Sequence, residues 1–473
     1  MRIRICGLIQ YSKSIITTVK NHTKHLIYSI VFFTVLTSCK SASDVKDQTT
    51  GENEVSYSEE QQQSLSYFNI YRGNNHSHTI YTWTHGAHRE KGISDLSDPT
   101  EFHPDWIVPP GMDYRDYNTI SLDPEDYTNR QGLPDNHFER AMNIGYDFYV
   151  ISDHSQEPTL QPVSIDNPVW QIMQKTADKY NDYPDFVALN GFEYGRNTPD
   201  DGGRGHINVI NSSEYVNADH GQRGPAPPWP EANWSIPEFY NWLKSAETHG
   251  NKGFVVAGFN HPGPDQYNDW DHIDSVIVKL VSTFEIHSRY GPIRWDAYIR
   301  ALNKGWKVSP IGVLDNHNFL NGYENQLPPP TFVLAPELTR EAITRAMQQR
   351  RTFASWVEGV ELRYSVNGFI MGSTLDNPDT FNFHIEVNTR NSRQEMIRCI
   401  QILRDHSGGE DDVEIAAEIL LEGNKNEIVW NPVIEDSSAR YFLLRIYHNR
   451  DMTYDGNLKF HGSTLSAPVW TGR

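Results

Sequence analysis

The sequence has little cysteine. Only three cysteines occur among its 473 residues, at positions 6, 39 and 399. That number excludes a fold held together by disulfide bonds and argues against a cysteine-rich structural zinc site. Cys399 lies in the apolar run 396–400 and is predicted to be a small buried hydrophobic residue. Stability must therefore come from a hydrophobic core, and the chain is long enough for more than one domain.

Positive charge is also scarce. The chain has 41 Lys and Arg residues against 61 Asp and Glu residues, which gives a net charge of −20. Its first 39 residues hold five basic residues and no acidic one, so the remainder is more acidic still. Such a chain is poorly suited to bind a phosphate backbone, because it offers few cations to displace counterions. Nucleic-acid binding is not expected as its main role.

The motifs of two large enzyme classes are missing. No glycine-rich phosphate-binding loop precedes a helix pattern, and no Gly-x-Ser-x-Gly elbow occurs. The sequence therefore gives no support to a nucleoside-triphosphatase or a serine hydrolase.

The apolar run near the N-terminus, residues 26–36, is too short to span a bilayer but suits the core of a signal peptide. It ends in Leu36-Thr37-Ser38-Cys39, which resembles the lipobox of bacterial lipoproteins. We therefore predict a lipoprotein signal peptide at 1–39, lipidation of Cys39, and a polar disordered tether at 40–66. The protein would be lipid-anchored in the bacterial cell envelope, either in the periplasm or at the cell surface. An ordinary secretory signal with a chance cysteine is the alternative.

Residues 67–355 alternate between strand-like and helix-like segments. Strands are predicted at 67–71, 147–151, 186–189, 207–210, 254–259, 281–286 and 308–314. Amphipathic helices are predicted at 137–143, 169–180, 237–246, 293–303 and 339–350. Helix caps are predicted at Ser235 and Thr339, and helix ends at Gly145, Gly250 and Gly305. Short apolar strands with intervening helices imply an α/β fold with a parallel sheet, either a seven-stranded βα barrel or an open doubly wound sheet.

The segment after the first predicted strand contains His76 and His78. Side chains alternate along a strand, so these two imidazoles share a face and make half of a metal site. A lone His-x-His pair is more often a surface or packing feature. Here, however, most of the other predicted strands also border on a His, Glu or Asp, namely Asp153, His154, Glu193, His206, His261, Glu285, His287, Asp315 and His317. Because the loops after the strands of a βα barrel share one rim, this recurrence predicts a metal site there.

Five motifs occur in the order seen in the PHP (polymerase and histidinol phosphatase) superfamily. They are His76-x-His78, Ser152-Asp153-His154, Gly191-x-Glu193, Asn260-His261-Pro262 and Asp315-x-His317. Residues 205–209, 346–355 and the trailing domain resemble the bacterial DUF3604 subfamily, whose function is unknown. The resemblance implies a distorted seven-stranded βα barrel that binds up to three divalent metal ions and hydrolyses phosphate esters.

The resemblance also implies a ligand set. One metal would take His76, His78, Glu193 and Asp315; a second would share Glu193 and add His206 and His261. A third would take His154, His317 and a residue a few places after His78. The family usually has Asp or His at that last position, where this chain offers Thr82, Thr84, His85 and His88, and His85 is chosen. Residues 89–133 are an additional insert, predicted to form a lid or substrate wall.

The remaining polar residues are candidates for catalysis or substrate binding: Asp153, Glu285, His287 and Arg289 as catalytic residues, and Arg196 and Arg204 as substrate-binding residues. Asp153 adjoins His154 on an extended chain, so only one of them can face the metals, and Asp153 is placed behind the ligands. Glu285 and His287 exceed what three metals need and would support the ligands or contact substrate. Arg196, Arg204 and Arg289 lie within a few residues of proposed ligands and could bind phosphate oxygens. The alternative for each arginine is an ion pair with one of the surplus carboxylates.

Imidazole and carboxylate donors without thiolate suit Zn, Mn or Fe. Two such ions would lower the pKa of a bridging water and stabilise the attacking and leaving oxygens of a hydrolysis reaction. Amidohydrolases also begin with His-x-His, but they typically bridge their metals with a carbamylated lysine, and no lysine lies between Glu193 and His206. This difference favours the PHP reading.

After residue 355 the pattern changes to strands alone, at 360–366, 381–387, 396–403, 414–421, 441–447 and 458–460. Residues 356–473 are therefore predicted to be an antiparallel β-sandwich domain following the hydrolase domain at 67–355. Taken together, the sequence predicts an extracytoplasmic metal-dependent hydrolase, most simply a phosphomonoesterase or phosphodiesterase. Its partner would be a small-molecule or glycan-linked anionic substrate. The alternatives are hydrolysis of another ester, sulfate or amide bond, and a non-catalytic lipoprotein that binds metal or glycan.

Overall fold

The computed structural model of the chain describes residues 2–4, 65–79, 81–82, 132–157, 160, 163–181, 185–196, 204–217, 235–246, 255–263, 266–288, 294–317, 330–390, 395–406, 412–452 and 462–473. Several predictions lie outside these residues, including lipidation of Cys39, the strand at 458–460 and the helix end at Gly250. Most of the predicted signal peptide, tether and insert lies outside them as well.

Seven consecutive strands form a sheet in chain order, and each coincides with a predicted strand. They are β2 (Asn69–Asn74), β3 (Phe148–His154), β4 (Val187–Arg196), β5 (Gly205–Ile210), β6 (Val256–Asn260), β7 (Val281–Ser288) and β8 (Ser309–Val313). Pairing is parallel from β2 to β4 and from β6 to β8, but β5 is antiparallel to both of its neighbours. The prediction of an all-parallel sheet is therefore wrong at β5, which begins only nine positions after the end of β4 and runs back along it.

The predicted closed barrel is not shown; the fold is α/β with a large mixed sheet and few helices. Just beyond their ends, the first and last strands are joined by a parallel bridge between Ser77 and Asn316. Two backbone hydrogen bonds flank that bridge, from His78 N to Asn316 O at 2.8 Å and from Asp315 N to His76 O at 3.0 Å. The side chain of Asn74, the last residue of β2, also accepts a hydrogen bond from Leu314 N at 2.8 Å.

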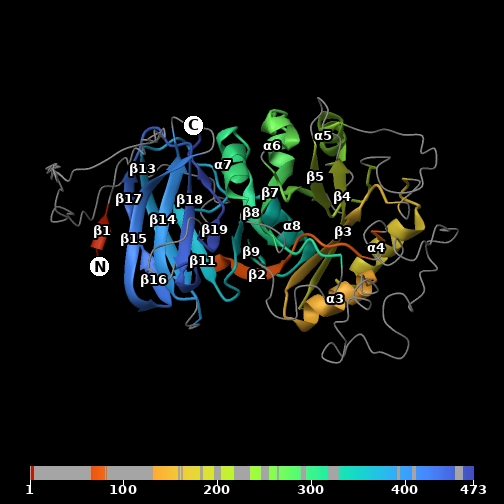
Figure 1. The fold of residues 1–473 in the computed structure, drawn as a ribbon, viewed down its shortest axis with the longest axis horizontal. Helices are drawn as coiled ribbons and strands as arrows, with labels where there is room; N and C mark the ends of the chain where they lie inside the picture. Colours follow the sequence, from red (N-terminus) through yellow and green to blue (C-terminus); the bar gives the residue numbers. More distant parts are fainter. Residues whose placement is uncertain are drawn as a thin grey trace, which may run out of the picture.

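One face of this sheet packs against helices on the outside of the molecule (Figure 1). The helices are α3 (Pro134–Asn143), α4 (Pro168–Tyr180), α5 (Ile236–Ala246), the single turn α6 (Ile277–Leu280) and α7 (Trp295–Asn303). Buried side chains from the helices, such as Trp170 and Phe239, form one core with strand residues of one parity, such as Tyr149 and Phe192. Within the described residues, none of the helices is long and apolar enough to cross a membrane.

Helix α8 (Arg340–Gln348) packs against the opposite face of the sheet. Ile343 and Met347 of α8 belong to a core with Val150 of β3 and Leu189 of β4. The predicted helix start is confirmed, because the Thr339 hydroxyl accepts a hydrogen bond from Ala342 N. The predicted cap at Ser235 and the helix ends at Gly145 and Gly305, both with positive φ, are confirmed as well.

The sheet continues beyond β2 into the C-terminal part of the chain. Its further strands, in spatial order, are β9 (Thr331–Ala335), β10 (Thr352–Ser355), β19 (Thr464–Ser466), β18 (Tyr441–His448), β14 (Ile397–Asp405), β15 (Val413–Lys425) and β1 (Arg2–Arg4), with β20 (Val469–Trp470) beside β18. A second antiparallel sheet contains β12 (Phe369–Ile370), β11 (Glu361–Val366), β13 (Thr380–Asn388), β16 (Glu427–Trp430) and β17 (Val433–Glu435). The two layers enclose a separate core, in which Phe381 and Phe383 pack on Phe442. Figure 1 shows β11 and β13–β19 at one end of the molecule, β3–β5 at the other, and β2 and β9 between them.

Candidate metal centre

The strands that pack against α8 carry apolar side chains near their starts and polar, metal-binding types of side chain near their ends. On β4, Val187 and Leu189 pack against α8, and Glu193, of the same parity, stands farther along the same face. On β3, Val150 is followed two and four residues later by Ser152 and His154. Because side chains alternate along a strand, an apolar start and a polar end of one parity place the hydrophobic core and the imidazoles on the same face.

The antiparallel strand β5 delivers its histidine from its start rather than its end. His206 is the second residue of β5, aligned with Gly195 of β4 and Asn260 of β6. The chain runs in the opposite direction there, so Ile210, at the far end of β5, packs in the core beside α8. The reversal of β5 therefore brings His206 to the edge of the sheet where the parallel strands end.

Glu193 is the centre of the cluster and has no solvent exposure. Its Oε2 atom lies 2.9 Å from His154 Nδ1 and 3.4 Å from Nε2 of both His76 and His78. Its Oε1 atom lies 3.0 Å from His206 Nδ1 and 3.4 Å from His261 Nε2. One carboxylate thus faces five imidazoles, which are all on the predicted ligand list.

Three groups of side chains bring ligand atoms within 4.8 Å of one another and could each hold a metal ion. They are His76 with His78 and Asp315, His154 with Glu193 and His206, and His78 with His154 and His317. The first group contains three of the four residues expected at the first metal. The third contains both described residues expected at the third metal. The structure therefore brings eight of the nine predicted ligands together, and the ninth, His85, lies outside the described residues.

Oε2 of Glu193 provides a test of whether metal ions fit the cluster. Three imidazole nitrogens lie within ion-pair distance of it, yet among the described residues none is positioned to donate a hydrogen bond to it. Nε2 of His76 and Nε2 of His78 also lie 3.0 Å apart. Lone pairs converge in this way around a cation, and a cation would satisfy both the carboxylate and the imidazoles. The donor set fits Zn, Mn or Fe.

The outer nitrogens of the two leading histidines have fixed partners. Nδ1 of His76 lies 2.6 Å from Glu285 Oε1, so the proton belongs on Nδ1 and Nε2 is free to face the cluster. Nδ1 of His78 lies 3.3 Å from the Thr82 hydroxyl, which donates in turn to Asp153 at 2.7 Å. Hydrogen bonds of this kind orient metal-binding imidazoles and fix their tautomers.

The charges in the cluster perturb its pKa values. Burial lowers the pKa of His76, but the carboxylates of Glu285, Glu193 and Asp315 outweigh burial and hold that pKa well above 6.5. Burial raises the pKa of Glu193, yet His154, His76 and His206 hold it well below 4.5. Burial and the neighbouring His154 and His317 lower the pKa of His78. Without metal ions, the site is therefore a buried mixture of carboxylates and charged and neutral imidazoles.

Two of the proposed ligands have backbone conformations that non-glycine residues seldom adopt. φ is +29° at His261 and +46° at Asp315. Close by, the turn Tyr267–Trp270 has positive φ at all four residues, and the Tyr267 hydroxyl lies 2.6 Å from His206 O and 3.0 Å from Asn260 O. Such backbone strain costs free energy and is concentrated at functional sites.

The side chains of the cluster differ in exposure. Those of His76, His78 and Glu193 have no exposure, whereas those of Asp315, His261 and His206 are 21%, 24% and 16% exposed. The described residues therefore leave part of the cluster open at Asp315, His261 and His206.

Two of the residues that were predicted to support the ligands, Glu285 and Asp153, form hydrogen bonds with the ligand-bearing segments. Glu285 is fully buried and accepts a hydrogen bond from His261 N at 2.6 Å, besides its contact with His76. Asp153 accepts hydrogen bonds from Thr79 and Thr82, which places it behind His78, as expected. Both were also considered catalytic candidates, but these contacts are with protein groups that support the ligands.

The other candidates have different surroundings. His287 Nδ1 accepts a hydrogen bond from Trp356 Nε1 at 3.1 Å, which ties β7 to the start of the C-terminal region. Arg196 has the opposite parity to Glu193 on β4 and lies toward α5. Hydrogen bonds from Ser235 are the main cause of the lowered pKa of Glu238 on that helix, and the charge of Arg196 lowers it further. Arg204 directly precedes β5, two residues before His206, and its carbonyl oxygen accepts a hydrogen bond from Tyr267 N at 2.6 Å. Arg289 lies outside the described residues.

Sequence reasoning missed the part played by hydroxyl and amide groups. Thr82 was considered only as an alternative metal ligand, and Thr79 and Tyr267 were not considered. Asn260 was noted only as part of a motif, yet its side chain donates to Glu193 Oε1 at 2.8 Å. Its position immediately before His261 is the one signal in the sequence that pointed to it.

No family model and no curated protein sequence matches the chain. Among solved structures, the chain is similar to a two-domain protein from Bacteroides vulgatus ATCC 8482 described as containing a predicted PHP-like metal-dependent phosphoesterase. The match has 15% sequence identity and a TM-score of 0.40, and covers 89% of this chain and 100% of the other. At that TM-score the likeness carries no argument about function, so the functional conclusion rests on the chain's own residues.

Proposed function

We propose that the chain is a metal-dependent hydrolase that binds two or three divalent ions, Zn, Mn or Fe, and cleaves phosphate esters. The observation that carries this proposal is Glu193, a buried carboxylate facing five imidazoles, with one oxygen that has no hydrogen bond. The order of the five PHP-like motifs along the chain supports the same reading independently.

The proposed ligand sets follow the geometry. His76, His78 and Asp315 would hold one ion with Oε2 of Glu193, and His206 and His261 would hold a second with Oε1. His154 and His317 would hold a third together with His78. The position predicted for His85 remains a prediction.

Divalent ions bound there would supply an acidified water and would neutralise charge on a phosphate group. The protein's own residues orient the ligands: Glu285 fixes His76, and Asp153 fixes His78 through Thr82. Arg204, two residues before His206 in the sequence, is proposed to contact the anionic substrate, small or glycan-linked. The exposed edges of Asp315 and His261 mark the side on which that substrate would bind.

The metal site is specified more sharply than the bond that is cleaved, because one metal site can serve several hydrolytic reactions. The choice of a phosphate ester follows the family resemblance. Carboxyl-ester, sulfate-ester and amide substrates are therefore included in the test below, as is a protein that binds metal without catalysis.

The experiment measures metal content and hydrolysis on the same preparation of residues 40–473. Two or three equivalents of Zn, Mn or Fe, with chelator-sensitive hydrolysis of aryl phosphate mono- or diesters, would support the proposal. In Asp315→Asn, metal content and turnover should both fall. The matched control is Asp379→Asn, whose carboxylate is exposed and pairs with Arg473. Metal without turnover on phosphate esters would move the search to the other bonds, and less than one equivalent after metal resupply would refute the site.

We also propose that the enzyme is anchored in the bacterial cell envelope through a lipid on Cys39. This proposal rests on the lipobox-like Leu36-Thr37-Ser38-Cys39 after a short apolar run. Expression of the full chain in a bacterium with a clickable fatty acid should label the protein, and Cys39→Ala should abolish the label. Equal labelling of both would refute the anchor.

A further inference from the structure

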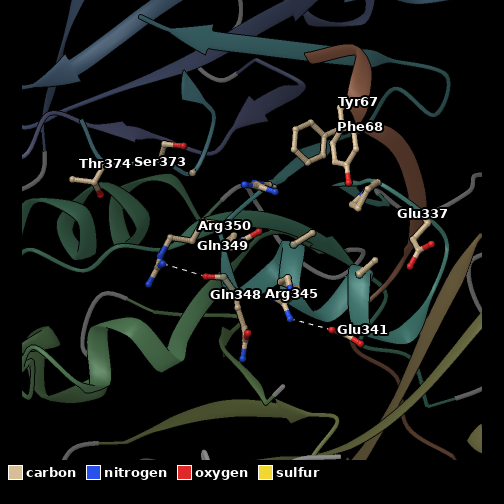
Figure 2. Close-up of a pocket in the computed structure, with 15 residues that line it drawn as sticks. Tyr67, Phe68, Glu337, Glu341, Arg345, Gln348, Gln349, Arg350, Ser373 and Thr374 are labelled. Atoms are coloured by element: carbon tan, nitrogen blue, oxygen red, sulfur yellow. Dashed lines mark hydrogen bonds and ion pairs between the residues drawn. The ribbon is translucent and has the colours of Figure 1, made fainter. Parts of the chain in front are cut away.

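A second site lies on the other side of helix α8 from the strands of the metal centre. A pocket of about 630 Å³ is lined by the start of β2, by α8, by the turn after α8 and by residues 372–374. Figure 2 shows Tyr67 and Phe68 above the helix that carries Glu341 and Arg345, with Ser373 and Thr374 at the far end. The pocket shares no residue with the proposed metal ligands.

Three cations gather at this pocket in an otherwise acidic protein. Arg350 and Arg351 line it, and Lys307 donates from Nζ to the hydroxyl of Thr374, another lining residue, at 3.0 Å. Within the described part of the chain, none of the three forms an ion pair with a carboxylate. By contrast, Arg345 of α8, which also lines the pocket, pairs with Glu341 at 3.0 Å.

Backbone carbonyls hold Arg350 in place without neutralising it. Its guanidinium donates to the carbonyl oxygens of Lys307, of Gln348 at 3.2 Å and of Val278 at 2.5 Å. Burial lowers the pKa of Arg350 to about 10, and burial together with Arg350 lowers the pKa of Lys307. The Trp470 ring also lies 5.9 Å from the Arg350 guanidinium and 5.7 Å from Lys307 Nζ. The positive charge is therefore fixed and partly desolvated, and no carboxylate among the described residues pairs with it.

Arg351 is the cation with most freedom to bind a ligand. Its guanidinium lies 4.7 Å from the ring centroid of Phe68, and within the described residues it makes no side-chain hydrogen bond. Burial lowers its pKa to about 10 as well. A guanidinium offers five N–H donors in a planar fork that matches the oxygens of a phosphate or a carboxylate.

We propose that this pocket is an anion-binding site, in which Arg351 binds a phosphate or carboxylate group of a small ligand and Arg350 and Lys307 supply further positive potential. A bound oxyanion would accept the hydrogen bonds that Arg351 lacks and would neutralise part of the buried charge. Hydroxyls of Ser373 and Thr374 and the half-exposed ring of Tyr67 would complete the site. The proposal does not depend on the hydrolase reaction.

The test titrates inorganic phosphate, and separately glucuronate, into the full-length protein by calorimetry at physiological ionic strength with chelator present. The wild type should bind at least one of these anions saturably. Arg351→Gln should weaken that binding at least ten-fold, whereas His76→Ala, which alters only the metal centre, should leave it unchanged. The charge control is Arg390→Gln, whose guanidinium is exposed and pairs with Glu361. Binding of phosphate but not glucuronate would identify a phosphate site, and the reverse would identify a carboxylate site.

A second variant keeps the test decisive if Arg351→Gln folds poorly. Glu341→Gln removes a negative charge from the lining and releases Arg345, so it should tighten anion binding by a few-fold. The proposal is overturned if the folded wild type binds neither anion, or if binding is lost in His76→Ala and is unaffected by both pocket variants.

Discussion

The face of the sheet that packs against α8 has two ends, which are built on the same strands but carry different kinds of side chain. At one end, Val150 and Leu189 pack against Ile343 and Met347 of α8. At the other end, His154 and Glu193 continue the same rows of side chains. The apolar end is stable as it stands, whereas the polar end buries carboxylates and imidazoles that could hold a metal ion. Changes at the two ends should therefore affect different properties.

The largest effect is expected from Glu193→Gln. Neutralising the residue that faces five imidazoles should abolish hydrolysis and reduce bound metal, because the amide is a poor ligand and leaves the histidines uncompensated. Metal analysis and turnover measure this effect. Glu386→Gln, an exposed glutamate that pairs with His384, is the control. Full activity in Glu193→Gln would break the proposed contrast between the two ends.

At the apolar end, Ile343→Ala should destabilise the fold by about 2–5 kcal/mol, because it leaves a cavity between α8 and the sheet. Metal content per folded molecule should stay the same. Denaturant unfolding, compared with Ile415→Ala at a 40% exposed position, measures the difference. The distinction between the two ends would fail if Ile343→Ala lost metal without losing stability.

Between these extremes stands Glu285→Gln, which changes a group that orients a ligand. Loss of the charged partner of His76 should weaken metal affinity or activity by about 10–100-fold. Competition with a chelating dye measures the affinity, and denaturant unfolding checks that the fold is retained. An unchanged metal affinity would show that Glu285 does not position His76.

The smallest effect is expected from Tyr267→Phe. Removing the hydroxyl near His206 O should cost about 1 kcal/mol, the usual net value of one hydrogen bond. The loss should appear as slightly weaker binding of the ion nearest His206. Tyr71→Phe, which removes a hydroxyl bonded only to an exposed Asn69, is the comparison. Equal effects of both variants would mean that the strained turn does not support the site.

The strands of the metal-binding half could be predicted because each is a short apolar run bordered by a metal-binding residue. The direction of each strand in the sheet could not be predicted, and β5 shows why. Its histidine stands at the start of the strand, so a parallel β5 would have carried His206 to the opposite end of the sheet. The position of His206 in the sequence contained the correct answer, but the rule for βα units outweighed it.

The candidate ligands could be predicted for the same reason, since the residue type and its place at a strand end together identify them. The residues that hold these ligands in place could not be predicted. Thr82 reaches His78 and Asp153 only because a segment four residues after His78 folds back on the strand end, and Tyr267 reaches His206 through a left-handed turn. Neither contact follows from periodicity. Strands β9 and β10 were also missed, because each flanks a helix and neither is directly followed by a His, Glu or Asp.

The continuity of the sheet through β9 and β10 has a consequence for how the protein could be divided. β10 pairs with β9 on one side and with β19, near the C-terminus, on the other. A truncation after residue 355 would leave the hydrogen-bonding edge of β10 bare, and bare edges recruit strands from other molecules. The last 118 residues therefore cover the strand edge of the half that carries the proposed metal centre. A chain released early from the ribosome, or clipped by a protease after β10, should aggregate rather than survive as a small working enzyme.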